Sequence, residues 1–442
     1  MEQITTRYAR NNDISVAYQV FGEGDVDLVF VPGFISHIEN YWDDPNFSRW
    51  LRKLSSFCRI IMFDKQGTGL SDRVGALPGM DERMDDVRAV MDAQGIEKAA
   101  LLGISEGGSL ATLFAAHNPD RSRALILYGA FAQFTSWFKT EKALANLFEY
   151  IDNDWGSGES LPMFAPTMQG DAAFKQWWGK FERLGGSPGA VKALMRMNSQ
   201  IDITDILPAV NVPTLVIHRT DDVTVDCQGG RLLAERIQNA KFVELPGIDH
   251  LPMVGENSDQ IVDEIAKFLT GAWEAVETER ILATVLFTDI VNSTEMMAKL
   301  GDRQWHDMLE RHHTVVRREL HRFRGREVDT AGDGFFATFD GPARAIRCAC
   351  EIRDAVAFLG IEIRAGLHTG ECEMISGKAG GIAVHIGARV MQEASPGEIL
   401  VSSTVKDLVA GSGLTFHDHG KYLLKGIPDN WRLFLLESKN LP

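Results

Sequence analysis

The pattern of apolar and polar positions changes about two-thirds of the way along the chain. Residues 1–272 alternate short apolar runs of strand type with longer helix-type segments, which is typical of an α/β sheet. Residues 283–442 follow a different order, with a strand, a long helix, a hairpin, a helix and further strands, which predicts an α+β sheet with helices on one side. We therefore predict two domains joined by a semi-rigid linker at 273–282.

One part of the first domain interrupts its alternation. The segment from about 131 to 205 is rich in Phe, Trp and Tyr and lies between two predicted core strands. It is interpreted as a helical cap, and its aromatic content predicts a small apolar or ester ligand. The simpler alternative, that these aromatic side chains only pack the cap onto the body of the domain, stays open.

The second domain begins with a pattern that places a carboxylate between a strand and a helix. The apolar run 285–287 leads to Asp289, and good helix-capping residues follow at 292–294. A second carboxylate, Asp333, lies in a Gly-Asp-Gly turn between two strand-like runs. A strand end followed by a helix N-terminus can bind phosphate or hold a metal through its carboxylate. The two positions therefore predict a two-metal phosphoryl-transfer site.

The first domain carries the pattern of a serine nucleophile. Residues 103–107, Gly-Ile-Ser-Glu-Gly, match G-x-S-x-G between a predicted strand and a predicted helix, as a nucleophile elbow requires. Asp221 and Asp222 end a later strand, and His250 follows them. The order Ser105, Asp, His is that of the α/β-hydrolases. The alternative is that Ser105 is a relic of the fold without a catalytic role, in a domain that only binds a ligand.

Composition and charge narrow the classes of partner. The chain has 442 residues and a net charge of −16, which argues against non-specific binding to nucleic acid or to an anionic membrane. It has no run of 18 apolar residues, so no membrane span is predicted. The five cysteines have neither zinc-site nor disulfide spacing, which fits a reducing compartment, so we expect a cytoplasmic protein.

Five segments of the second domain, in order, resemble the class III nucleotide cyclases over residues 279–437. They are FTDIVNST, DTAGDGFFATF, AGLHTGE, GIAVHIGARV and LKG. The resemblance implies a ferredoxin-like core and two Mg²⁺ or Mn²⁺ ions per site, held by Asp289, Asp333 and the carbonyl of Ile290. These ions would assist attack of the ribose 3′ oxygen on the α-phosphorus of ATP.

The same resemblance implies a homodimer whose sites are split between protomers. His385 and Arg389, four residues apart on a predicted helix, would come from the partner protomer. Arg389 corresponds to the family's transition-state arginine, and His385 stands where many members have asparagine. The family's adenine-reading lysine and aspartate correspond to Asp329 and Lys378, so the choice between ATP and GTP stays open.

The first domain resembles the α/β-hydrolases over about residues 14–270. The segments that carry this likeness are PGF, DKQGTGLSD and the elbow. The resemblance implies that the catalytic acid is Asp222 rather than Asp221, and that the backbone N–H groups of Phe34 and Glu106 form the oxyanion hole.

Together these features predict a cytoplasmic homodimeric adenylate cyclase fused to an α/β-hydrolase domain, a layout that resembles bacterial, notably mycobacterial, proteins. The hydrolase domain is either an esterase-like enzyme or a ligand sensor. The alternative is an esterase or lipase-like hydrolase whose cyclase domain is weak, silent or guanylate-selective.

Overall fold

The computed structural model describes residues 4–74, 79–138, 140–271, 280–375 and 378–437. The chain forms two compact units, residues 1–277 and 278–442. Most of the predicted linker lies outside the described residues. Its last three residues, 280–282, already belong to the first strand of the second unit.

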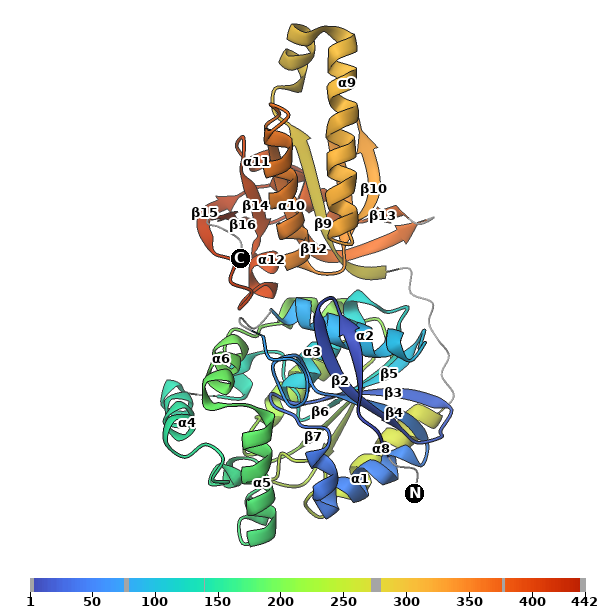
Figure 1. The fold of residues 1–442 in the computed structure, drawn as a ribbon, viewed down its shortest axis with the longest axis vertical. Helices are drawn as coiled ribbons and strands as arrows, with labels where there is room; N and C mark the ends of the chain where they lie inside the picture. The colour runs from blue at the N-terminus through green and yellow to red at the C-terminus, as the bar shows by residue number, and fades with distance from the viewer. Residues whose placement is uncertain (1–3, 75–78, 139, 272–279, 376–377, 438–442) are drawn as a thin grey trace. The chain divides into compact units, whose positions relative to one another are not determined.

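The first unit is built on one eight-stranded sheet. Its strands are β1 (Arg7–Asn11), β2 (Ile14–Phe21), β3 (Val26–Val31), β4 (Cys58–Phe63), β5 (Ala99–Ile104), β6 (Ser122–Tyr128), β7 (Thr214–Arg219) and β8 (Lys241–Leu245). The strand order is β1-β2-β4-β3-β5-β6-β7-β8, with antiparallel pairing of β1, β2 and β4 and parallel pairing beyond (Figure 1). All six residues of β5 are buried, because a parallel sheet is covered on both faces.

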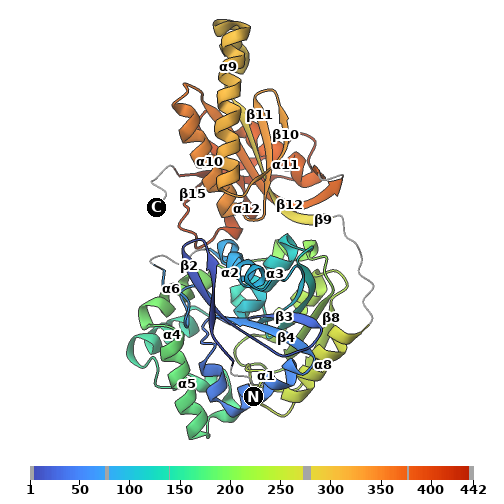
Figure 2. The same cartoon turned by 45° about the vertical axis from the view of Figure 1, so that its right-hand side comes forward.

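Helices cover both faces of this sheet. They are α1 (Pro45–Ser55), α2 (Met80–Ala93), α3 (Glu106–His117), α4 (Glu141–Asn153), α5 (Ala172–Gly185), α6 (Pro188–Asn198), α7 (Cys227–Arg236) and α8 (Ser258–Thr270). Figure 2 shows α2 and α3 on one face and α1 and α8 on the other. Helices α4, α5 and α6 form the insertion between β6 and β7, where the aromatic segment of the sequence lies.

The second unit contains a mixed sheet with the order β10-β11-β9-β12-β14-β16-β15, and β13 pairs with β12. Its strands are β9 (Arg280–Ile290), β10 (Arg326–Ala331), β11 (Gly334–Phe339), β12 (Ile363–Ile375), β13 (Lys378–Gly380), β14 (Ile399–Ser402), β15 (Phe416–Tyr422) and β16 (Trp431–Leu436). Its helices are α9 (Ser293–Arg322), α10 (Pro342–Ala357), α11 (Ile382–Glu393) and α12 (Ser403–Leu408). The α+β class predicted for this part is confirmed.

The expectation that the helices cover one side of this sheet is wrong. Leu286 of β9 packs with Val316 of α9 and Ile346 of α10 in one cluster. The preceding residue, Val285, packs with Ala383 of α11 in another cluster. Successive strand residues face opposite sides of a sheet, so α11 lies on the side away from α9 and α10. Strand β9 is apolar on both faces and therefore needs helices on both.

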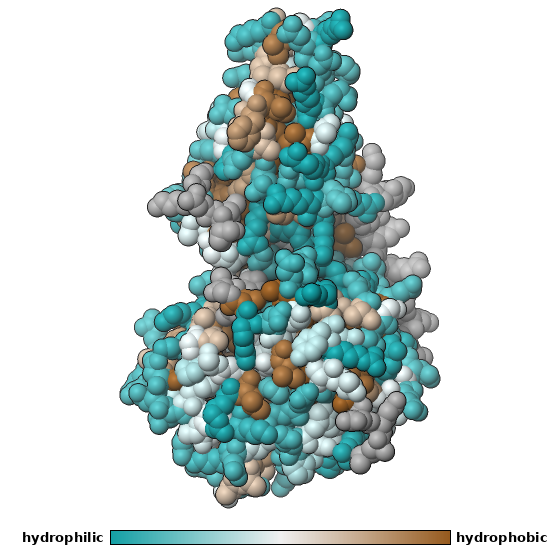
Figure 3. Space-filling view, in the orientation of Figure 1, coloured by the Kyte–Doolittle hydropathy of each residue, from teal (hydrophilic) through white to brown (hydrophobic). Residues whose placement is uncertain are grey.

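No helix within the described ranges is both long enough and apolar enough to cross a membrane. The face of the molecule drawn in Figure 3 is largely hydrophilic, with apolar side chains only in scattered small areas.

Candidate active sites

The nucleophile elbow lies at the end of the central strand of the first unit. Strand β5 ends at Ile104 and α3 begins at Glu106, so Ser105 forms the turn between them with φ 55° and ψ −127°. A positive φ is strained for a residue with a side chain and is typical of functional turns. A Cβ atom at Gly107 would lie 2.2 Å from the carbonyl oxygen of Pro32. Only glycine therefore allows this close approach of the helix to the loop after β3.

The structure brings Asp222 and His250 together. Nδ1 of His250 lies 2.8 Å from Oδ2 of Asp222, and both side chains are buried. The other oxygen of Asp222 accepts from the N–H groups of Thr224 and Val225 at 2.9 and 3.0 Å. Burial raises the pKa of Asp222, but the charge and hydrogen bond of His250 outweigh it and hold that pKa below its usual value. Asp222 is therefore an ionised partner that fixes the imidazole.

Asp221 takes no part in this pair. Its carboxylate accepts from the hydroxyl of Thr220 in an exposed position. Gly129, at the end of β6, allows His250 to reach its place, since a Cβ atom there would lie 2.9 Å from Cε1 of the imidazole. The residue pattern left two neighbouring aspartates, and the resemblance to the α/β-hydrolases favoured Asp222, which is the one that contacts His250 in the structure.

Ser105 and His250 line one small cavity of about 70 Å³. Nε2 of His250 is buried and has no hydrogen-bond partner within the described residues. The cavity walls are mainly apolar and aromatic, and they include Phe34, Phe164, Trp177, Trp178, Phe181 and Met253. Several of these belong to the insertion between β6 and β7, so at least part of the aromatic content predicted for a cap forms the wall of this cavity.

The loop after β3 lies directly against the nucleophile. A Cβ atom on Gly33 would be 3.6 Å from Cβ of Ser105. The N–H of Phe34 has no hydrogen-bond acceptor among the described residues, and none outside its own helix is found for the N–H of Glu106. These two backbone groups are the ones that the sequence resemblance proposed as the oxyanion hole.

A buried ionic cluster beside the elbow was not foreseen from the sequence. The carboxylate of Glu106 pairs with the ammonium group of Lys65 and, at 3.0 Å, with Nη1 of Arg83, and all three side chains have 0% exposure. Burial lowers the pKa of Lys65 to about 8, although Glu106 acts in the opposite direction. Burial raises the pKa of Glu106, but Lys65 and Arg83 outweigh it, and the net pKa is below the usual value. The sequence did contain a sign of this cluster, because Glu106 is a charged residue in an elbow whose other residues are apolar or small.

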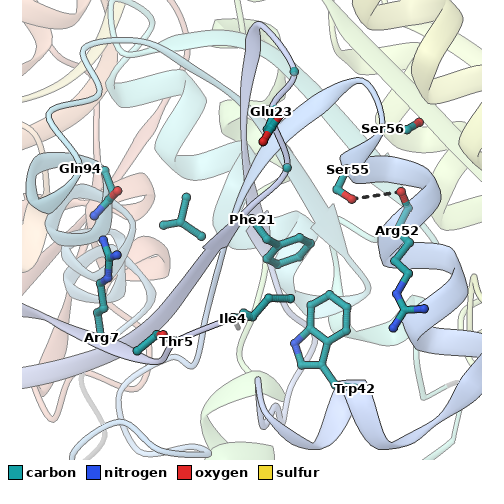
Figure 4. Close-up of a pocket in the computed structure, with 13 residues that line it drawn as sticks. Ile4, Thr5, Arg7, Phe21, Glu23, Trp42, Arg52, Ser55, Ser56 and Gln94 are labelled. Carbon is teal, nitrogen blue, oxygen red and sulfur yellow. Dashed lines mark hydrogen bonds between the residues drawn. The ribbon is translucent and has the colours of Figure 1, made fainter. Parts of the chain in front are cut away.

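A second hollow in this unit is not lined by the residues predicted for catalysis. Figure 4 shows this groove, of about 850 Å³, with Phe21 and Trp42 between Arg7 and Arg52. None of the residues predicted for either active site lines it. Its greater volume is therefore no guide to catalysis, and the smaller aromatic cavity is the candidate substrate pocket.

In the second unit the two predicted metal carboxylates lie at the same end of neighbouring strands. Asp289 is the penultimate residue of β9, and Asp333 lies in the turn between β10 and β11. Thr288 pairs with Phe335, so the antiparallel register carries the end of β9 to this turn. Ile290, whose carbonyl was the third predicted ligand, is the last residue of β9.

The donor set fits a divalent cation in one specific respect. Oδ2 of Asp333 is buried and has no hydrogen-bond partner among the described residues, and a bound cation would satisfy such an oxygen. Within the same residues no group of three or more His, Cys, Asp or Glu side chains gathers as a metal cluster. The set would therefore be two carboxylates completed by backbone and substrate oxygens, as is usual for Mg²⁺.

An arginine that the sequence analysis did not single out contacts the first of these carboxylates. Arg364 of β12 pairs across the sheet with Asp289, and its Nη2 and Nε donate to Oδ2 at 2.6 and 3.1 Å. The sequence signal was a charged residue in the otherwise apolar run 363–367. Arg364 holds the Asp289 carboxylate in one orientation, and a cation bound there would share this carboxylate with it.

Helix α9 covers the turn that carries Asp333. Nε2 of His313 donates to the carbonyl of Gly332 at 3.1 Å, because a carbonyl can only accept. His312 is fully buried, and burial is the main cause that lowers its pKa to about 4. His313 therefore fixes the backbone of the turn, whereas His312 packs against the ring of Phe335. Both histidines were also missed from the sequence.

His385 and Arg389 lie one turn apart on α11, as their spacing predicted. His385 is exposed. Arg389 is half-buried and donates to the carbonyl of Lys425 at 3.1 Å and to the side chain of Gln392 at 2.6 Å. No hydrogen bond or ion pair found in the described part of this single chain joins either residue to Asp289 or Asp333.

The two predicted base-reading residues lie on different strands. Asp329 is in β10 and pairs with Phe336 of β11. The backbone of Lys378 begins β13, and its side chain lies outside the described residues.

Comparison with known proteins assigns each unit. The hydrolase family described as serine aminopeptidase, S33 (Hydrolase_4) matches residues 24–257, more than half of the chain. The adenylate and guanylate cyclase catalytic domain matches residues 276–438.

Curated relatives and solved structures match the first unit. The bifunctional esterase/perhydrolase DCH of Acinetobacter calcoaceticus is 25% identical over 268 residues, which are 57% of this chain and 93% of the relative. The putative carbamate hydrolase RutD of Caulobacter sp. (strain K31) is 28% identical over 217 residues, which are 45% of this chain and 76% of the relative. The crystal structure of esterase RhEst1 from Rhodococcus sp. ECU1013 is 26% identical, covers 60% of this chain and 98% of its own, and has a TM-score of 0.52.

These matches and the two sheets confirm the predicted fold classes. The chain belongs to the α/β-hydrolase family of the first match, and it carries an adenylate and guanylate cyclase catalytic domain at its C-terminal end.

Proposed function

We propose that the C-terminal domain converts ATP to cyclic AMP and pyrophosphate at a site shared by two copies of the chain. The observation that carries this proposal is a buried oxygen of Asp333 that has no hydrogen-bond partner in the described part of the chain. It lies beside the end of β9, where Asp289 lies. A carboxylate left in this state is suited to a cation, and an acidic chain needs cations to bind a triphosphate. The family match to a cyclase catalytic domain supplies the reaction class.

Each predicted residue of the cyclase site would have a separate role in the reaction. Asp289, Asp333 and the Ile290 carbonyl would hold Mg²⁺ or Mn²⁺, which when bound would activate the ribose 3′ oxygen and neutralise the leaving pyrophosphate. Arg364 keeps the Asp289 carboxylate oriented. Arg389 of a second copy would bind the phosphate oxygens that gain charge during the reaction, and His385 would donate a hydrogen bond beside it.

The decisive experiment is product analysis of the full-length protein. Each of the four nucleoside triphosphates is incubated with Mg²⁺ or Mn²⁺, and cyclic nucleotide and pyrophosphate are quantified by chromatography. We expect metal-dependent cyclic AMP formation that EDTA abolishes. A product that is neither a cyclic nucleotide nor accompanied by pyrophosphate would refute the proposal.

The shared site predicts complementation between two inactive variants. Asp289→Ala and Arg389→Ala should each lose activity, because in each homodimer both sites lack one essential side chain. Mixed after subunit exchange, they should recover up to about a quarter of wild-type activity, since half of the dimers are mixed and each holds one intact site. Activity is measured as cyclic AMP formed, and exchange is followed with two affinity tags. Parental inactivity in a mixture with demonstrated exchange would exclude a split site.

We propose that Asp329 distinguishes adenine from guanine in the bound nucleotide. Its carboxylate would accept from the N6 amino group of adenine, while Lys378 would donate to N1. Asp329→Ala is therefore expected to lower the ratio of kcat/KM for ATP over GTP by roughly tenfold or more, because the wrong base leaves polar groups unpaired. The metal concentration for half-maximal activity should change less. Asp302→Ala, an exposed carboxylate change on α9, is the control. An unchanged ratio would show that Asp329 does not read the base.

For the N-terminal domain we propose a serine esterase acting on short acyl esters. The supporting observation is the cavity of about 70 Å³ that contains both Ser105 and His250 within apolar walls. Its size favours a short acyl group, and the relatives named as an esterase/perhydrolase and as methyl ester esterases point to the same class of bond.

In this proposal Nε2 of His250 takes the proton of the Ser105 hydroxyl as the serine oxygen attacks the ester carbonyl. Ionised Asp222 stabilises the resulting imidazolium through Nδ1. The imidazolium then returns the proton to the leaving alcohol, and water releases the acyl group by the same route. The N–H groups of Phe34 and Glu106 would receive the negative oxygen in both steps.

A ligand sensor is the second candidate for this domain, because the same aromatic cavity could retain a small apolar molecule. A panel of acetyl, propionyl and butyryl esters separates the two functions. Turnover identifies an esterase. Saturable binding of an ester without turnover, measured by calorimetry, identifies a sensor.

A further inference from the structure

Lys65 contacts both chain segments that supply the proposed oxyanion hole. Its ammonium group donates to the carbonyl oxygen of Gly33 at 2.6 Å and pairs with the carboxylate of Glu106. Gly33 belongs to the loop after β3, and Glu106 is the first residue of α3. These segments are far apart in the sequence and adjacent in space at Ser105.

The contact with Gly33 fixes more than a carbonyl group. The carbonyl of Gly33 and the N–H of Phe34 belong to one peptide unit, and this unit is trans, since no cis peptide bond occurs among the described residues. In a planar trans peptide the C=O and N–H point in opposite directions. Lys65 thus anchors one side of this peptide and directs the Phe34 N–H to the other side. A cation on the carbonyl also polarises the peptide and makes its N–H a stronger donor.

The second donor is held through its own side chain. Lys65 binds one carboxylate oxygen of Glu106, and Nη1 of Arg83 binds the other at 3.0 Å. The side chain of Glu106 is thereby fixed from two directions, and its backbone N–H begins α3 next to Ser105. One buried lysine therefore links the two peptide groups that must point at the same oxygen.

Stability alone is a weak reason for such a pair. Taking two charges out of water is costly, and replacing a buried ion pair by apolar side chains is often neutral or stabilising. The Lys65–Glu106 pair has 0% exposure for both side chains, so that cost is present here in full. A role in orienting the backbone gives the cluster a function that apolar residues could not supply.

We propose that Lys65 is a positioning residue that orients and polarises the Phe34 N–H of the oxyanion hole and fixes Glu106 beside it. This inference rests on the serine-esterase function proposed above. It assigns no contact between Lys65 and the substrate, so loss of Lys65 should slow both acylation and deacylation without weakening ester binding.

The kinetic test uses the full chain with two variants. Lys65→Met removes the ammonium group, and Lys65→Met/Glu106→Gln also removes the carboxylate that would be left without its lysine partner. We expect kcat for p-nitrophenyl acetate to fall about 10- to 100-fold, part of the loss seen when an oxyanion donor is removed, with KM within about twofold. The matched control is Asp44→Asn, a buried carboxylate that accepts from the Phe47 N–H at the start of α1 and contacts neither Lys65 nor an oxyanion segment. An equal loss of kcat in the control, or kcat within twofold of wild type in both lysine variants, would overturn the proposal.

A second readout does not depend on turnover. The protein is labelled with ¹⁵N-phenylalanine, and the Phe34 amide signal is identified by its absence in Phe34→Leu. In folded Lys65→Met this amide proton should move upfield further than every other phenylalanine amide, because its peptide loses the cation on the carbonyl. An unmoved signal would refute the inference even if the enzyme were active. Failure of the esterase proposal would instead appear as absent ester turnover and absent fluorophosphonate labelling in the wild type, with the Phe34 signal still shifted.

Discussion

Replacing Asp333 by alanine is expected to lower cyclic nucleotide formation by roughly a hundredfold or more, because a metal ion supplies several kcal/mol of transition-state stabilisation. The buried Oδ2 of Asp333 has no partner among the described residues, so the change removes an oxygen that is available to a bound cation. The fold should persist, since no hydrogen bond of this oxygen is lost. Initial rates of cyclic AMP formation with Mg²⁺ and with Mn²⁺ measure the effect.

Two controls accompany this variant. Asp307→Ala removes an exposed carboxylate of α9 and should leave the rate unchanged. Ester hydrolysis by the first domain should also be unchanged in Asp333→Ala. Binding of Mn²⁺, followed by electron paramagnetic resonance, should weaken in parallel with activity. A rate within a few-fold of wild type would remove Asp333 from the metal site.

Replacing Ser105 by alanine is expected to lower ester hydrolysis at least about a thousandfold, as loss of a serine nucleophile does in other triads. The physical basis is the strained backbone of Ser105 and the nearby Nε2 of His250, which lies in the same cavity and has no hydrogen-bond partner among the residues described. Hydrolysis of p-nitrophenyl acetate and labelling by a fluorophosphonate should both disappear.

Ser109→Ala is the matched control for this serine. Ser109 lies one turn further along α3, where its hydroxyl donates to the carbonyl of Phe131 at 2.6 Å. This variant should keep ester turnover and labelling. Undiminished hydrolysis by Ser105→Ala would mean that another group attacks the ester. Cyclic nucleotide formation in both variants also shows whether ester chemistry influences the second domain.

Features that depend on neighbours along the chain were readable from the sequence. The elbow around Ser105 is encoded by a strand, a small residue on each side and a helix, because the tight turn is set by its own backbone. The turn carrying Asp333 is likewise local, since Gly-Asp-Gly between two strand patterns favours a hairpin. Both fold classes follow from the order of apolar runs, and both are confirmed.

The contacts between distant residues were decided only by the tertiary structure. Lys65 meets Glu106 across 41 positions, and Arg364 meets Asp289 across 75. A charged residue in a sequence has many possible partners, and only the strand order and register choose one. The side of the sheet that α11 covers was likewise beyond the sequence pattern, because β9 is apolar on both faces.

The sequence by itself determined the two fold classes, the elbow and the approximate places of the carboxylates, because each depends on short-range periodicity and turn chemistry. The tertiary structure determined which residues pair with Glu106, what contacts the oxyanion loop and what contacts Asp289. Those outcomes depend on burial, which makes an unpartnered charge costly and therefore selects its partner from the residues that the fold brings within hydrogen-bond distance.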